Sequence, residues 1–180
     1  MNLVYSVKLG EATGSEPVSL LEAKSQLKID FSTDDTLLTA LITAARLQIE
    51  KITGVSLVAR QVDLIAKLDG CHLFELPYGP LDTTSLIVTK LKVTPGGTDE
   101  LLTTTDYIVR GDYFAQLHVA NGDGMFAITY DAGYTVVPQA LKEAILHQVS
   151  YLYEHRGDED INGMSATAKA LIMPFRRVVI

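Results

Sequence analysis

Helical spacing of apolar residues occurs on both sides of a long stretch that lacks it, and this arrangement limits the folds available to the chain. Residues 32–54 and 137–157 each place such side chains along one helical face. In the first stretch the face consists of Leu38, Leu41, Ile42, Ala45, Ile49 and Ile52. In the second it consists of Leu141, Ile145, Gln148, Val149 and Leu152. A helix cannot bury its own apolar face, so these two are expected to pack together, and residues 55–134 become an insertion between them.

The inserted stretch has the pattern of β-strands. Residues 61–68 and 85–93 alternate and are rich in β-branched side chains, and Asn-Gly-Asp-Gly at 121–124 is typical of a hairpin turn. We therefore predict an α+β fold, in which a small helical bundle carries an inserted antiparallel β-module of about five or six strands. The expected parts of this single domain, residues 1–180, are an arm (1–16), two N-terminal helices (17–54), the inserted β-module (55–134), a long helix (137–157) and a C-terminal helix with a docking tail (165–180).

Local signals mark where the two N-terminal helices begin and end. Ser19 and Glu22 have the spacing of a capping box, in which the hydroxyl and the carboxylate each bind a backbone N–H of the first turn. Ser32 or Thr33 is expected to cap the second helix, with acidic residues following at its positive end. Gly54 stands where a left-handed residue ends it.

A corner with two prolines lies inside the β-module. Pro77, Gly79 and Pro80 separate two apolar runs within residues 72–88. Such a loop occurs in active sites and also at simple corners of a sheet. Proline restricts φ and glycine permits a sharp reversal, so we interpret this corner as architecture.

The overall charge is acidic, and this restricts the partners. The net charge is −7, from 22 acidic and 15 basic residues. Proteins that wrap a nucleic-acid backbone need clustered lysine and arginine, so this mode of binding is not expected. The single cysteine, Cys71, excludes an internal disulfide and a multi-cysteine metal site. We expect a cytosolic product with no membrane role, because no secretory signal or apolar run of membrane-spanning length is present.

Motifs for catalysis or cofactor binding are absent from the sequence. The four histidines, His72, His118, His147 and His155, do not have the spacing of a zinc site. The charged run at 154–160 is the best metal candidate, but a run that follows a helix is usually a solvated loop. No phosphate-binding loop and no nucleophile elbow occurs. We therefore predict no catalytic, cofactor-binding or metal-binding residues.

Five stretches in order resemble one known family, the head–tail connector (adaptor, or head-completion) proteins of long-tailed bacteriophages and prophages. The first two are "VSLLEAKSQLKID" and "DDTLLTALITAARLQIEKITG", a short helix followed by a long one that ends at Thr-Gly. The third is "LFELPYGPLDTTSLIV", with its Leu-Pro-x-Gly-Pro corner. The others are "ITYDAGYTVVPQALKEAILHQVSYLYEHR" and "ALIMPFRR". Together they extend from Val18 to Arg177, whereas residues 1–16 carry no part of the resemblance.

This resemblance implies a structural protein at the head–tail junction of the virion, present in the host cytoplasm during assembly. Members of the family form a ring, usually of about twelve subunits, under the portal. The ring extends the channel through which double-stranded DNA passes without sequence recognition. It also provides a platform for the stopper or tail-completion protein. No cofactor and no membrane are implied.

The C-terminal segment is the expected contact with the portal, because such adaptors typically dock there. Its apolar, methionine and arginine side chains are those that interfaces favour. The alternative is that this segment folds back on its own domain. The predicted docking residues are Leu171, Ile172, Met173, Pro174, Phe175, Arg176, Arg177, Val178, Val179 and Ile180.

The acidity suggests a negative channel wall that keeps DNA from binding. Asp158, Glu159 and Asp160 are candidates for that wall, as are the acidic gap at 30–35 and the loops of the β-module. The alternative is that the negative charge only provides solubility.

Two other functions compete with the connector. One is another virion component, such as a tail-completion protein. The other is a small enzyme or ligand-binding domain built on the β-module. Its candidate residues are His118, Asp123, Tyr107, Tyr113 and Tyr130, and it requires a deep pocket where they converge.

Overall fold

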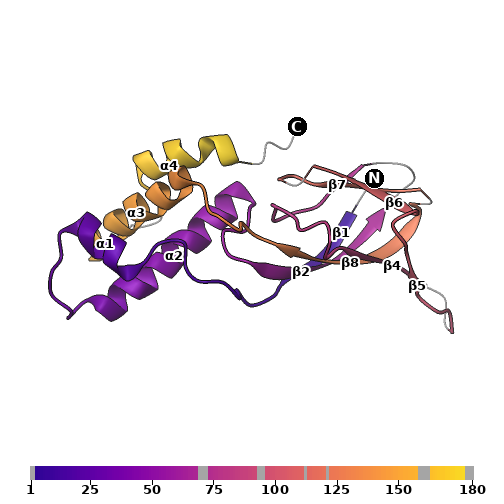
Figure 1. Ribbon diagram of the computed structural model, residues 1–180, viewed down its shortest axis with the longest axis horizontal. Coiled ribbons are helices and arrows are strands. Elements are labelled where there is room, and N and C mark those ends of the chain that lie inside the picture. Colours follow the sequence, from indigo (N-terminus) through magenta and orange to yellow (C-terminus); the bar gives the residue numbers. More distant parts are fainter. Residues whose placement is uncertain are drawn as a thin grey trace. The chain divides into compact units, whose positions relative to one another are not determined.

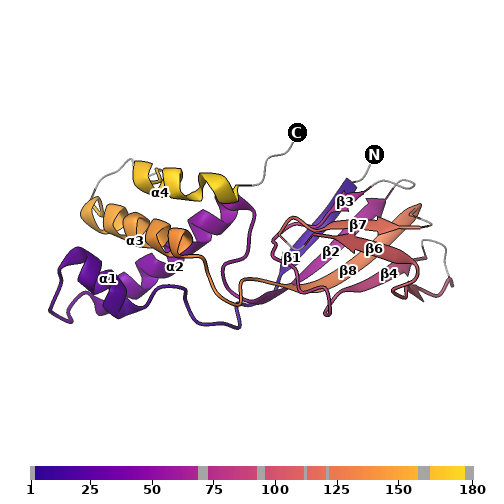
Figure 2. The ribbon, with the colours of Figure 1, turned by 45° about the horizontal axis from the view of Figure 1, so that its top comes forward.

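The computed structural model describes residues 3–68, 73–92, 96–111, 113–120, 122–157 and 163–176. It divides into two compact units, one of strands and one of helices (Figures 1 and 2). The β-unit comprises Met1–Gly14 and Val58–Tyr134, and the helical unit comprises Ser15–Leu57 and Thr135–Ile180. The helical unit is thus assembled from two segments of the chain on either side of Val58–Tyr134, as an insertion requires, whereas the β-unit also includes the N-terminal residues. Asn121 of the predicted hairpin turn lies outside the described residues.

The helical unit packs its helices around one long central helix. Its elements are α1 (Leu20–Leu27), α2 (Asp35–Thr53), α3 (Gln139–Glu154), α4 (Ala166–Ile172) and the short 3₁₀ helix η1 (Met173–Phe175). Helices α1, α2 and α4 all contact α3. The side chains of Leu141, Ala144, Ile145 and Val149 are fully buried on α3, which confirms the expected packing of the N-terminal and C-terminal helices.

Most of the predicted boundaries of α1 and α2 are confirmed, and one is wrong. Ser19 and Glu22 form both bonds of the capping box, with the Glu22 amide donating to Ser19 Oγ over 3.2 Å and the Ser19 amide donating to Glu22 Oε2 over 2.7 Å. Gly54 ends α2 in the left-handed conformation, at φ 72°. Neither Ser32 nor Thr33 caps α2, because its N-cap residue is Asp34. The Asp34 carboxylate does not cap either; it accepts a hydrogen bond from Tyr153 Oη of α3 over 2.5 Å.

The buried face of α2 differs in part from the predicted one. Its apolar centre is correct, since Leu38, Ile42, Ala45 and Ile49 are buried. At the C-terminal end, however, Ile52 is 41% exposed, whereas the ionic side chains of Arg46 and Glu50 are buried. These two charges satisfy each other inside the unit, so the buried face includes positions that the apolar pattern leaves out.

The β-unit contains two antiparallel sheets. One has the order β1-β2-β8-β4-β5 and the other has the order β3-β7-β6. The described residues form eight strands, more than the five or six expected, because two strands have only two residues and one comes from the N-terminus. The strands are β1 (Leu3–Leu9), β2 (Arg60–Leu68), β3 (Phe74–Glu75), β4 (Ile87–Leu91), β5 (Glu100–Leu101), β6 (Tyr107–Arg110), β7 (Gln116–Val119) and β8 (Gly124–Ala132).

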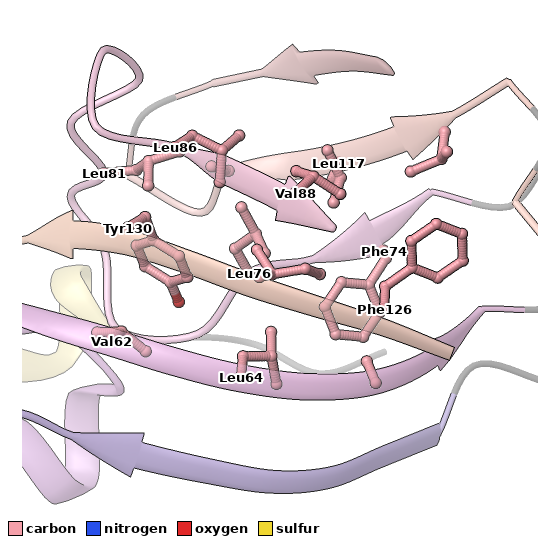
Figure 3. Packing of buried hydrophobic residues seen from close by; sticks show 14 of the residues in the cluster. Val62, Leu64, Phe74, Leu76, Leu81, Leu86, Val88, Leu117, Phe126 and Tyr130 are labelled. Atoms are coloured by element: carbon pink, nitrogen blue, oxygen red, sulfur yellow. The ribbon is translucent and has the colours of Figure 1, made fainter. Parts of the chain in front are cut away.

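Both sheets and the loops between them contribute to one apolar core (Figure 3). On β2 and β8 buried residues alternate with more exposed ones, as predicted for strands with one face against a core. The members labelled in Figure 3 are Val62, Leu64, Phe74, Leu76, Leu81, Leu86, Val88, Leu117, Phe126 and Tyr130.

The N-terminal residues belong to the large sheet, whereas the sequence suggested only an arm. Strand β1 pairs antiparallel with β2, with Lys8 opposite Asp63 and Leu9 opposite Val62. An edge strand of this kind is defined by a partner more than fifty residues away in the chain. Its own short pattern therefore gives little indication of it.

The proline corner is joined to the end of β8. The carbonyl of Pro77 accepts a hydrogen bond from Tyr130 Oη, and the carbonyl of Pro80 accepts one from the Gly133 amide over 2.9 Å. Leu81 forms a bridge with Ala132 just before that amide. These bonds use the corner's carbonyl groups to fix it against the sheet, which is an architectural role.

Gly133 stands where backbone segments come very close together. Its φ is +136°, and a Cβ atom at this position would lie 2.8 Å from Ala59 Cα, Ala59 N and Val58 O. On the same segment, the Ala59 carbonyl accepts a hydrogen bond from the Thr13 amide over 2.9 Å. The three chain segments that enter or leave the β-unit are therefore held together at this end of it.

Candidate functional site

The tyrosines proposed for a β-module active site have structural partners. Tyr130 is buried in the core and donates its hydroxyl hydrogen to the Pro77 carbonyl. The Tyr107 hydroxyl lies 3.4 Å from the carbonyl oxygen of Leu86. Both hydroxyls thus bind backbone carbonyl groups of the loop between β3 and β4.

Tyr113 forms a pair with Tyr134. Their hydroxyl groups are hydrogen-bonded, and their rings meet edge to face with centroids 5.8 Å apart. Burial raises the pKa of Tyr113 above its ordinary value, and burial together with the neighbouring hydroxyl raises the pKa of Tyr134. Both phenols therefore stay protonated at neutral pH, where a general base or nucleophile would need to ionise.

The other two candidates, His118 and Asp123, differ in exposure. The Nδ1 atom of His118 is buried and has no hydrogen-bond partner among the described residues. Asp123 is exposed. Within the described ranges, no three histidine, cysteine or acidic side chains are placed to hold a metal ion. Cys71 and His72 lie outside those ranges.

An open hollow of about 500 Å³ lies in the helical unit instead, between α1, α3 and α4. It is lined by Gln26, Leu27, Lys28, His147, Ser150, Tyr151, Glu154, Ser165 and Thr167. None of the five β-module candidates contributes to it, so this hollow is not the convergent pocket that the enzyme hypothesis requires. None of the described helices is long and apolar enough to span a membrane.

The described part of the predicted docking segment divides into an inward and an outward set. Ile172 is 2% exposed and packs inside the helical unit. Met173 is 62% exposed, and Pro174 and Arg176 are also exposed. Leu171 and Phe175 are half-buried. The predicted docking residues Arg177, Val178, Val179 and Ile180 lie outside the described residues, as do the predicted channel residues Asp158, Glu159 and Asp160.

A buried glutamine holds α4 in place. Gln148 of α3 is completely buried, and its Nε2 donates to Gln48 Oε1 over 2.8 Å and to the Gly163 carbonyl over 3.3 Å. Its Oε1 accepts from the Ser165 amide over 2.9 Å, and Ser165 Oγ in turn caps α4 by accepting from the Ala168 amide. The sequence placed Gln148 on an apolar face but did not indicate this role.

Two carboxylates of the acidic gap before α2 are already paired within the helical unit. Asp34 binds Tyr153, and Asp35 binds Lys24 Nζ over 2.7 Å. Asp30 is exposed. Much of the negative charge of this gap is therefore engaged in holding the helices together.

The C-terminal end of the helical unit exposes Met173 and Arg176, and methionine and arginine are among the residue types enriched in subunit interfaces. The family comparison gives the particular family. Residues 18–176 match the model of the family described as "Head completion protein", and the chain belongs to this family. The membership confirms the resemblance found in the sequence and assigns the chain a structural role in head completion.

Solved structures with the same fold come from gene transfer agent (GTA) particles. A chain in the neck of an empty GTA particle, computed with C6 symmetry, has a TM-score of 0.72 and 19% identity, with 96% of this chain and 97% of that chain covered. A chain in the virion of the native particle has a TM-score of 0.71 and 20% identity, with 100% of this chain and 97% of that chain covered. A chain in the neck of the native GTA particle, computed with C12 symmetry, has a TM-score of 0.68 and 21% identity, with 96% of this chain and 97% of that chain covered.

These likenesses confirm the α+β fold over nearly the whole chain, including the N-terminal residues outside the family match. No protein of curated function matches the sequence closely enough for comparison.

Proposed function

We propose that this protein is a head–tail adaptor that assembles with copies of itself into a ring between the portal and the stopper or tail. The family match over residues 18–176 carries the proposal. Further support comes from the two neck structures, one of them computed with twelve-fold symmetry, whose chains share the fold of this one. A ring of about twelve copies would extend the DNA channel through heterologous contacts that close on themselves.

The portal contact is assigned to residues 171–180. In the described part, Met173, Pro174 and Arg176 provide an exposed apolar and basic surface at the end of the helical unit. Ile172 anchors this surface to the bundle and is not itself available to a partner. A firmly held helix with an exposed end is well suited to docking, because little of the binding free energy is lost in ordering it.

The DNA that passes through the ring is proposed to meet a negative wall, which keeps it from binding, and to pass without sequence recognition. The two segments of the β-unit contain eleven acidic and six basic residues, so most of the net negative charge belongs to that unit. Asp158, Glu159 and Asp160 remain proposed wall residues. Reversing their charges is expected to slow ejection of DNA or leave DNA bound in the neck. Unchanged retention and ejection would remove these residues from the wall.

The whole chain is proposed to act as one connector domain, with a structural and not a catalytic role. The helical unit needs both of its chain segments, and the β-unit is inserted between them. We place the protein at the head–tail junction of the virion, and in the host cytoplasm during assembly. Another virion component, such as a tail-completion protein, is the alternative, and the order of rings along the particle axis distinguishes the two.

The first test is the mass of the protein in solution, measured by light scattering over a wide concentration range, with electron microscopy of the same sample. Closed rings with a central channel are expected, either for the protein alone or once portal rings are added. A protein that forms no ring under either condition and does not bind portal would contradict the adaptor function.

The portal contact is tested by deleting residues 173–180. This end point keeps Ile172, whose loss would damage the bundle itself. The deletion is expected to abolish binding to portal rings while the thermal unfolding of the protein stays nearly unchanged. Leu21→Asp is the matched control, because Leu21 is an exposed apolar residue (79%) on α1 of the same unit. Portal binding that survives the deletion would refute the assignment.

A further inference from the structure

A buried ionic cluster lies on α2, at positions outside the apolar face that the sequence predicts. Arg46 and Glu50 are only 5% and 4% exposed. Arg46 Nη1 donates to Glu50 Oε2 over 3.0 Å. Its other nitrogens bind Glu16, with Nε 2.8 Å from Oε2 and Nη2 3.1 Å from Oε1. This two-bond pairing of a guanidinium with a carboxylate is the strongest form of such a contact.

Every charge in this cluster has a partner. Burial alone disfavours the guanidinium cation, but the hydrogen bonds and charges of Glu16 and Glu50 outweigh it and raise the pKa of Arg46 above its ordinary value. Thr43 Oγ1 donates a further bond to Glu16 Oε1 over 3.0 Å. A buried charge that loses its partner is strongly unfavourable, so the members of such a cluster hold one another in position.

Two members of the cluster are attached to connections between the units. Three chain connections join the units, after Gly14, after Leu57 and after Tyr134. Glu16 lies two residues beyond the first of them. Glu50 Oε1 accepts a hydrogen bond from the amide of Leu57, the last residue before the second, over 2.8 Å. The first connection therefore reaches α2 through Glu16 and Arg46, and the second reaches it through Glu50.

The geometry points to a lock: Arg46 and Glu50 together fasten two of the three connections of the inserted β-unit to helix α2. Because one guanidinium binds both carboxylates, the two connections are coupled and open together. The lock is independent of the adaptor function and of any partner. It makes this part of the helical unit a cooperative element, whose opening sets how freely the two connections move.

The test is hydrogen–deuterium exchange, measured by mass spectrometry on peptides that cover residues 15–19 and 55–59. Glu16→Gln removes the charge of a carboxylate that is 30% exposed, so Arg46 and, through it, Glu50 are held less firmly. We expect exchange to become about tenfold faster in both peptides, including at Leu57, which Glu16 does not bind. Peptides within α2 and α3 should keep their wild-type rates.

Two further variants sharpen the result. Arg46→Lys keeps the charge but cannot bind two carboxylates with a planar fork, so it should also accelerate both peptides. Glu154→Gln, at an exposed position of α3, is the control and should leave the exchange rates of both peptides unchanged. Faster exchange at 15–19 alone would mean that Glu16 makes an independent contact, and the lock would be refuted. Parallel acceleration throughout the helices, or no change in either peptide, would refute it as well.

Discussion

Replacing Gly133 with alanine tests whether the close approach of chain segments at the end of the β-unit where Gly133 meets Val58 and Ala59 limits the stability of the protein. The added Cβ atom would lie 2.8 Å from Ala59 Cα, Ala59 N and Val58 O. All three are backbone atoms, which cannot move aside as the end of a side chain does. Gly133 also has a φ of +136°, a conformation that alanine rarely adopts.

The expected loss of stability follows from these contacts. The backbone conformation costs an alanine about 1–3 kcal/mol. Relief of the overlap adds about 1–3 kcal/mol, as for other overpacked sites. If the backbone shifts, the bond from the Gly133 amide to the Pro80 carbonyl is weakened, at about 1 kcal/mol. We expect a total of about 3–7 kcal/mol, a large part of the stability of a typical domain.

The assay is urea denaturation followed by circular dichroism, with Gly96→Ala as the control. Gly96 also has a positive φ, +78°, but its added Cβ would have no neighbour within 4 Å among the described residues beyond those adjacent in the chain. The control therefore carries the cost of a positive φ without an overlap, and the larger loss expected for Gly133→Ala reflects the overlap together with the more extreme φ at Gly133. If the losses of unfolding free energy in the two variants differ by less than about 1 kcal/mol, the segments around Gly133 give way easily and their close approach does not limit stability.

Three further predictions concern single contacts. Gln148→Leu leaves the Ser165 amide and Gln48 without their buried partner, so it should lower the free energy of unfolding by about 2–4 kcal/mol and make α4 sensitive to protease. Unchanged resistance to protease would contradict the role of Gln148 in holding α4. Ser19→Ala should cost about 1 kcal/mol in thermal unfolding, because it removes the capping box, and a loss no larger than that of Ser25→Ala on the same helix would count against it. Hydrogen bonds from Ser19 lower the pKa of Glu22 in the folded protein. The stabilisation that these bonds provide is therefore present above pH 4.5 and is lost as the pH falls through the lowered pKa of Glu22. Ser19→Ala should weaken this dependence when the free energy of unfolding is measured against pH. Tyr130→Phe removes the hydroxyl that binds the Pro77 carbonyl and should cost about 1–2 kcal/mol in urea denaturation, whereas a neutral effect would mean that this bond does not hold the corner.

Features that depend on neighbouring residues in the chain were predictable. The capping box of Ser19 and Glu22 involves positions three apart, and the left-handed end at Gly54 depends on a single residue. Five short stretches in order were enough to indicate the family, which the match over residues 18–176 confirms. The α+β fold followed from the order of helical and strand patterns.

Features that depend on distant residues were not predictable in the same way. Strand β1 was taken for an arm because its partner, β2, lies far along the chain. Arg46 and Glu50 have the spacing of an ordinary surface ion pair, but Glu16 and the Leu57 amide, both distant in the chain from at least one of them, supply further partners that allow their burial. The apolar pattern of the C-terminal segment predicts Ile172 as a docking residue, but its side chain packs within its own unit.

By itself, the sequence determined the helices and the longer strands of the β-module, and it carried the signature of the family, because capping, periodicity and turn chemistry act over a few residues. The tertiary structure decided which of the polar and apolar side chains are enclosed. Gln148 and Arg46 became structural because several segments converge on them, and Met173 stays at the surface because the neighbouring Ile172 occupies the inward position. Burial depends on all the segments that surround a residue, and this information is spread over the whole chain.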